Sequence, residues 1–284
     1  MKKPAFYKIM AALALAGAAL LPAETSALNP DPDSYITPDR FFACYLPNTV
    51  GKGRLLFTVD HRAAEPAFDN PLEDGFGLDA GAFKIGLGLR YGLLDNFDVG
   101  FRRANNIWET YDTYEWDARY QLQWEEKLGV DLSMTGGFTW FYIPDAEDAS
   151  GFGLGLLLGK TLSRRIYLST GFLSHTNSSY ANGMAAPPMG KTDSADVFSV
   201  ALPVGLNVTL KKGLSLTAEG ALPFSGYSAG YPSWAAGLKI ETLQHTFSLF
   251  LTTTQYFTAD GFVCGSDRGA NPVLGFLITR QSGK

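Results

Sequence analysis

Residues 112–142, DTYEWDARYQLQWEEKLGVDLSMTGGFTWFY, contain two runs in which apolar and polar side chains alternate. The first run reaches Trp124, and after a short turn at 126–129 the second run continues to Tyr142. A period of two is typical of a β-strand with one apolar face and one polar face. Each run has at least the roughly 9–11 residues that a tilted membrane-spanning strand needs, with aromatic residues towards its ends. The segment therefore predicts a transmembrane β-hairpin.

The same alternation recurs along the rest of the chain and predicts 12 strands in total. The predicted strands cover approximately residues 54–62, 83–92, 97–102, 114–125, 130–142, 152–158, 166–172, 198–210, 214–218, 234–240, 247–251 and 274–278. Short connections alternate with longer ones, as in bacterial outer-membrane barrels, where only closure pairs every backbone edge. We predict an all-β fold: a closed, antiparallel, up-and-down transmembrane β-barrel of about 12 strands, with short periplasmic turns and longer extracellular loops.

Residues 1–27 have the pattern of a signal peptide. Two lysines precede a short apolar run that ends at Leu21, and small residues offer cleavage after Ala23 or Ala27. Residues 28–52 contain four prolines and little alternation, so we predict an irregular segment that lies in the periplasm or plugs the lumen. The barrel is expected to cover residues 53–284.

Composition favours a membrane barrel and argues against several other classes. The chain has 31 glycines, 13 tyrosines and 20 phenylalanines, which are plentiful in closed antiparallel sheets. A net charge of −5 argues against nucleic-acid binding, which requires a basic face. We predict no metal site and no cofactor. The expected location is the outer membrane of a Gram-negative bacterium, with membrane lipid, a small polar solute and the barrel-assembly machinery as partners.

Tryptophan placement supports the same orientation of the strands. Four of the five tryptophans, Trp116, Trp124, Trp140 and Trp234, fall on the predicted lipid-facing side near strand ends. A ring that is half in hydrocarbon and half among headgroups is favoured there, so we expect these four to lie at the lipid interface.

Cys44 and Cys264 are the only two cysteines, and a disulfide between them is one prediction. The predicted topology assigns them to opposite sides of the membrane. A bridge therefore requires the N-terminal segment to pass through the lumen. The stretch from Cys44 to Gly53 could just span that distance when extended, at roughly 3.3 Å per residue.

Four short phrases, DHR at 60–62, LDNFDVGF at 94–101, LTTTQ at 251–255 and LGFLITR at 274–280, resemble a family of bacterial outer-membrane β-barrels whose domain has no known function. The likeness spans roughly residues 44–280. It implies a β-barrel fold and an outer-membrane location. The family carries no established activity, so the resemblance assigns no functional residue.

Charged side chains of both signs fall on the polar face of the predicted strands. They are Asp60, Arg62, Lys84, Arg90, Asp98, Arg102, Glu115, Asp117, Arg119, Glu219, Lys239 and Glu241. In an open barrel they would line a water-filled lumen and select among small solutes. The alternative is a plugged barrel, filled by ion pairs and hydrogen bonds, that has a structural role or anchors partners. The leading prediction is a passive pore for small solutes.

His175 is the one candidate for catalysis, in phase with inward residues and followed by Thr176, Asn177, Ser178 and Ser179. A histidine beside serines and an asparagine is loosely like the site of barrel enzymes that cleave lipid esters, in which histidine activates a serine. However, the chain has no GxSxG motif. We favour a histidine in a polar loop at the rim, and the prediction is that the protein is not an enzyme.

Overall fold

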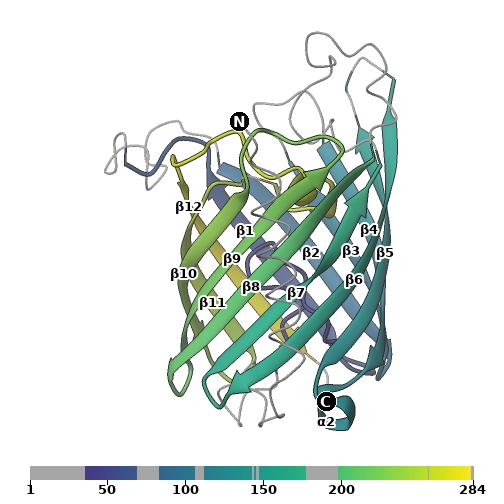
Figure 1. Cartoon of the computed structure of the whole chain (residues 1–284), viewed down its shortest axis with the longest axis vertical. Helices are drawn as coiled ribbons and strands as arrows, with labels where there is room; N and C mark the ends of the chain where they lie inside the picture. Colours follow the sequence, from purple (N-terminus) through teal and green to yellow (C-terminus); the bar gives the residue numbers. More distant parts are fainter. Residues whose placement is uncertain are drawn as a thin grey trace.

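The computed structural model describes residues 36–68, 83–105, 112–142, 144, 147–176, 198–254 and 256–282. The predicted signal peptide, residues 1–27, lies outside these ranges. Twelve strands form a closed barrel in which each strand is antiparallel to both neighbours (Figure 1). The strands are β1 (Leu55–Ala63), β2 (Phe83–Leu94), β3 (Phe97–Ala104), β4 (Asp112–Gln123), β5 (Asp131–Tyr142), β6 (Ala149–Ser163), β7 (Ile166–His175), β8 (Ser199–Lys211), β9 (Leu214–Ser225), β10 (Ser233–Glu241), β11 (His245–Thr252) and β12 (Val273–Ser282). The predicted fold class is confirmed.

The connections alternate in length as predicted, and the short ones lie at one end of the barrel (Figure 1). Within the described residues, helix occurs as α2 (Glu125–Leu128) and α3 (Ala259–Val263), and no helix there is long and apolar enough to cross a membrane. The predicted turn at 126–129 contains α2, which ends at Gly129 with φ of 80°. Glycine adopts this left-handed conformation without the steric cost of a Cβ atom.

The two faces of the barrel have opposite polarity. Apolar side chains cover the outer face, where Met134 is 53% and Leu154 is 68% exposed. Charged side chains such as Asp60 and Arg62 on β1 point inward and are fully buried. A water-soluble barrel would have the reverse arrangement, whereas a lipid-exposed barrel requires this one.

The barrel interior is occupied by a segment that precedes β1. We call residues 36–50 the plug, and Figure 1 shows this purple stretch inside the barrel. All of its residues except Thr37 and Asn48 are buried. The loop between β11 and β12 also enters the barrel, where Phe262 on α3 packs in the same apolar cluster as Phe41 of the plug and Tyr167 of β7. The core of the molecule is therefore the lumen itself.

Candidate functional site

The lumen is the candidate site because polar side chains from all around the wall converge on the plug. Each of the twelve charged residues predicted to line the interior has a buried side chain in the structure. Asp117 as a whole residue is half-buried, but its side chain alone is only 7% exposed, so this side chain is also buried. Whether these residues line an open pore stays a prediction.

Glu219 on β9 binds three consecutive backbone N–H groups of the plug. Its carboxylate accepts hydrogen bonds from the N–H groups of Phe42 at 2.9 Å, Ala43 at 2.8 Å and Cys44 at 3.0 Å. Hydrogen bonds to a charged acceptor are stronger than neutral ones, and buried N–H groups need a partner. One wall side chain thus satisfies a stretch of plug backbone that has no regular secondary structure.

Other strands bind the plug backbone in the same way. On β3, Asp98 accepts a hydrogen bond from the N–H of Val50 at 2.9 Å. On β12, the amide oxygen of Gln281 accepts one from the N–H of Thr37 at 2.6 Å. The plug is therefore held from several directions by acceptors on the wall.

Arg90 on β2 connects carboxylates of the wall and the plug. Its guanidinium donates to Asp98 at 2.6 Å, to Asp117, and to Asp39 of the plug at 3.4 Å. Burial alone would raise the pKa of Asp39, but Arg40, Arg90 and further arginines together hold that pKa well below its usual range. Asp39 is therefore ionised, and its charge is compensated by Arg40 within the plug and by Arg90 of the wall.

Arg119 on β4 binds main-chain carbonyl groups of the plug. It donates to the carbonyl of Asp39 at 3.1 Å and to that of Leu46, while its other terminal nitrogen contacts Asp98 at 3.1 Å. Wall carboxylates thus bind the N–H groups of the plug, and a wall arginine binds its C=O groups.

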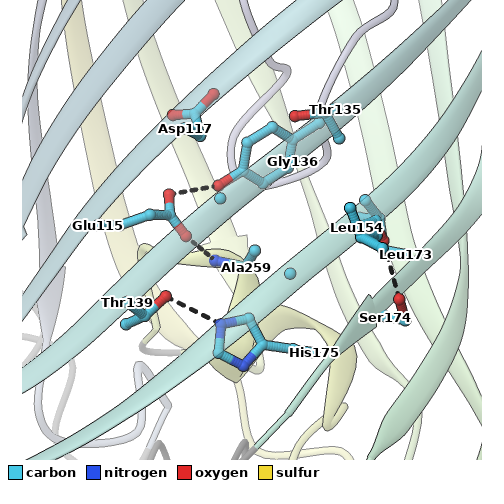
Figure 2. A pocket seen from close by; sticks show the side chains of 13 residues that line it. Glu115, Asp117, Thr135, Gly136, Thr139, Leu154, Leu173, Ser174, His175 and Ala259 are labelled. Atoms are coloured by element: carbon cyan, nitrogen blue, oxygen red, sulfur yellow. Dashed lines mark hydrogen bonds between the residues drawn. The ribbon is translucent and has the colours of Figure 1, made fainter.

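Glu115 on β4 links the plug to the loop that carries α3 (Figure 2). It accepts hydrogen bonds from the hydroxyl of Tyr45 at 2.6 Å and from the N–H of Ala259 at 2.7 Å. The small cavity beside it has a volume of about 20 Å³, which is roughly the space of one water molecule. The plug and the loop therefore meet in the lumen with little space between them.

Two glycines of the wall provide room for the plug and for the residue that follows it. A Cβ atom at Gly205 on β8 would overlap the ring of Phe41, and one at Gly92 on β2 would overlap the carbonyl oxygen of Gly51. Close approach of backbone or side chain to a strand is a common reason for glycine in a strand interior. The wall is shaped to fit the segment that occupies it.

His175 is buried, so the prediction of a histidine at the polar rim is wrong. It ends β7 with its side chain in the lumen, where Nε2 lies 2.9 Å from Oγ1 of Thr139 and Nδ1 contacts the carbonyl of Thr176 (Figure 2). Residues 177–179 of the predicted cluster lie outside the described residues. The error arose because β7 extends three residues beyond the predicted strand end.

Cys44 and Cys264 are both buried, and the predicted disulfide between them is not formed in the structure. The plug does pass through the lumen, as such a bridge would require, and both cysteines belong to one apolar cluster. Burial raises the pKa of the Cys44 thiol well above its usual range. A thiol in this state reacts slowly.

The four tryptophans lie on the outside of the barrel or at its short-turn end. Trp116 is 41% and Trp234 is 36% exposed on the outer face. Trp140 donates a hydrogen bond to Asp148 at 3.0 Å, and Trp124 directly precedes α2. Their role at a lipid interface stays a prediction.

Sequence reasoning did not identify the plug residues that contact the wall. Asp39, Arg40 and Tyr45 lie in a segment without strand periodicity, and their partners are far away along the chain. One local signal could have identified them. The run DRFFACY at 39–45 combines charged and aromatic residues, whereas the rest of this segment has the composition of a linker.

A family model identifies most of the chain as a barrel domain. Residues 47–281 match a family model described as a membrane bound beta barrel domain (DUF5777). No curated protein matches the chain.

Among solved structures, the KdgM porin is 8% identical with a TM-score of 0.47, over 80% of this chain and 99% of that one. An outer membrane channel from Pseudomonas putida F1 is 11% identical with a TM-score of 0.46, over 87% of this chain and 100% of that one. Outer membrane phospholipase A from Escherichia coli is 11% identical with a TM-score of 0.41, over 88% of this chain and 95% of that one.

Proposed function

The chain belongs to the family of membrane-bound β-barrel domains, and from this premise we propose that it is a channel for small polar solutes that its own plug closes. Its location is the outer membrane of a Gram-negative bacterium, where closed barrels with an apolar outer face reside. The solute, and assembly by the barrel-assembly machinery, are part of the proposal.

The observation that carries the proposal is the kind of bond that holds the plug. Glu219, Asp98 and Gln281 accept hydrogen bonds from its backbone, and Arg119 donates to its carbonyl groups. Water can replace each of these partners. A wall of apolar side chains would instead collapse or dewet once the plug left.

A charged wall suits the lining of an open state. Without the plug, side chains such as Arg90, Arg119 and Glu219 would face a hydrated lumen. Water would then solvate their charges, so no charge would be buried without a partner. Their mixed signs would act on passing ions and polar solutes. The structure thus corresponds to a closed channel in this proposal.

The second candidate is a permanently plugged barrel that has a structural role or anchors partners through its long loops. The close packing of Phe42 of the plug on Phe250 of β11, with ring centroids 4.2 Å apart, favours it. The two candidates differ in one property, since only a channel conducts when the plug is displaced.

A lipid-modifying hydrolase is the third candidate, and the geometry gives it little support. His175 points into the lumen, whereas acyl chains contact the outer face. Within the part of the chain that the structure describes, the hydroxyl of Thr139 lies within hydrogen-bond distance of its ring. If lipid hydrolysis were found, its disappearance in His175→Ala would support the enzyme instead.

The test is single-channel recording in planar bilayers with two matched one-methyl changes. Gly205→Ala places a methyl group into the Phe41 ring, whereas Gly136→Ala meets its nearest atom, Cδ2 of Leu154, at an ordinary 3.4 Å. We expect Gly205→Ala to raise the fraction of time that the channel is open and Gly136→Ala to behave like the wild type. Silence of both variants at high protein load would favour the plugged structural barrel.

A further inference from the structure

The ring of Phe250 on β11 lies directly on the inner surface of the neighbouring strand β12. A Cβ atom at Gly275 of β12 would overlap Cε2 and Cζ of this ring. On the other neighbouring strand, β10, a Cβ atom at Gly237 would overlap the Cβ atom of Phe250. Glycine in a strand often marks the close approach of another group. Two glycines of the wall thus leave room for the ring to present one face to the lumen.

Phe42 of the plug covers this face of the Phe250 ring. The two ring centroids are 4.2 Å apart and the ring planes differ by 16°, so the rings are stacked face to face. Ala235 and Leu277 complete an apolar cluster with the two rings. The backbone N–H of the same residue, Phe42, donates a hydrogen bond to Glu219 at 2.9 Å. One plug residue therefore contacts both an aromatic face and a carboxylate of the wall.

The carboxylate and the ring lie near one another on the wall. Glu219 on β9 is in register with Ala235 on β10, which is in register with Thr252 on β11, two residues after Phe250. Two strand spacings, about 10 Å, therefore separate the strand of the carboxylate from the strand of the ring. Ala235 and Gly237, which face the lumen between them, are small. Both groups can therefore contact the same molecule.

A carboxylate beside an exposed aromatic face suits a carbohydrate. The face of an aromatic ring carries negative charge density and attracts C–H groups, and one face of a pyranose ring consists of C–H groups. Sugar hydroxyl groups can donate to Glu219 as the backbone N–H groups of residues 42–44 do. Because the negative charge of Glu219 repels anions, a neutral sugar suits the site better than an acidic one.

We propose that the plug occupies the binding site of a neutral saccharide, whose ring stacks on Phe250 and whose hydroxyl groups donate to Glu219. The inference rests on the proposed function, because a saccharide reaches these groups only after the plug has left the lumen. Saccharide and plug then compete for the same wall groups. A saccharide that binds the open barrel therefore raises the population of the open state.

The first test measures maleimide labelling of Cys44, which leaves the lumen with the plug, in the full chain with maltose, lactose or sucrose added. At low maleimide concentration the labelling rate follows the open population. With a sugar at ten times its dissociation constant for the open barrel, the rate should rise about tenfold. Sugars excluded from the protein surface favour compact states, so a general solvent effect would slow labelling instead. Rates that rise with none of the three sugars would overturn the proposal.

Two phenylalanine variants assign the effect to the ring of Phe250. In Phe250→Leu, which lacks the aromatic face, the labelling rates with and without sugar should become equal. Phe141→Leu should retain the difference, because Phe141 is a similarly buried residue of β5, on the opposite side of the barrel. Comparing each variant with itself corrects for any change in how tightly the plug is held. The same sugar response in both variants would contradict the site.

Single-channel recording of Gly205→Ala separates failure of this inference from failure of the proposed channel. If the channel conducts, each sugar that accelerates Cys44 labelling should interrupt the current, with interruptions more frequent at higher sugar concentration. Steady current that none of the three sugars interrupts would overturn the saccharide site and leave the channel in place. Absence of current would overturn the channel, and the saccharide site with it.

Discussion

The carboxylate of Glu219 shows how much of the plug's position depends on single wall side chains. It replaces the water that three backbone N–H groups would otherwise bind, and these three groups belong to consecutive residues, 42–44. The plug has no sheet or helix partner for those groups, so the charge of Glu219 takes the place of secondary structure.

Glu219→Gln should loosen the plug, because a neutral amide accepts weaker hydrogen bonds. A loss of about 2 kcal/mol corresponds to roughly 30-fold faster exposure of the buried Cys44 thiol. Maleimide labelling followed by peptide mapping measures this rate separately from that of Cys264. Glu241→Gln is the matched control, since Glu241 pairs with Lys239 on its own strand at 2.6 Å. An unchanged labelling rate of Cys44 in Glu219→Gln would contradict the role given to Glu219.

Asp39 makes plug binding depend on pH. Arginines lower its pKa in the closed state below its ordinary value of 3.8, and the pKa returns towards that value when the plug leaves the lumen. The stabilisation from Asp39 is therefore fully present well above pH 3.8 and is lost as the pH falls below it. The labelling rate of Cys44, divided by that of an exposed thiol at the same pH, should rise on acidification, and Asp39→Asn should weaken this dependence. Equal pH profiles for wild type and Asp39→Asn would contradict the assignment.

At the scale of elements, β1 and the loop between β11 and β12 are joined by one buried arginine. Arg62 donates to Asp60 at 2.8 Å and to the carbonyl groups of Thr254 at 3.0 Å and Tyr256 at 2.6 Å. These bonds hold the start of the loop inside the barrel. The ion pair itself is fully buried, so loss of one partner leaves the other charge without compensation.

Arg62→Met should lower the free energy of unfolding by about 3–5 kcal/mol, because Asp60 remains buried and charged. Adding Asp60→Asn should recover part of that loss. Urea unfolding in lipid vesicles measures both effects. Arg103→Met is the control, since it removes an exposed pair and should change stability by less than about 1 kcal/mol. A double variant as unstable as Arg62→Met alone would contradict this explanation.

The strands could be predicted from the sequence because the membrane requires an apolar residue at every second position. The predicted positions of the strand ends were less accurate, because the alternation of apolar and polar residues is weaker there. β6 covers Ala149–Ser163 and β9 covers Leu214–Ser225, whereas the alternation predicted 152–158 and 214–218. Backbone pairing continues beyond the regular pattern, through residues 159–163 of β6 and past Pro223 in β9.

The inward direction of charged residues such as Arg90 was predictable from the same alternation, but their partners were not. Asp39, which pairs with Arg90, lies in a segment that has no period to analyse. The contact between Glu219 and Phe42 joins residues 177 positions apart, and no local pattern encodes it. The sequence therefore indicated a polar lumen while leaving open whether the lumen was filled.

At the scale of the whole molecule, the barrel and its plug form one core. The wall supplies charged acceptors and donors, the plug supplies backbone groups, and α3 covers the plug within the same apolar cluster. Hydrogen bonds, ion pairs and packing hold the plug in the lumen, and among the described residues no disulfide joins it to the wall. We therefore expect the plug to be the part that blocks conduction.

Conductance of the chain with and without residues 28–52 tests this claim most directly. Both forms would be inserted into planar bilayers after heat-shift gels confirm that each is a folded barrel. We expect near silence for the chain that keeps residues 28–52 and stable single-channel steps for the shortened one. Equal conductance of the two folded forms, or silence of both, would contradict it.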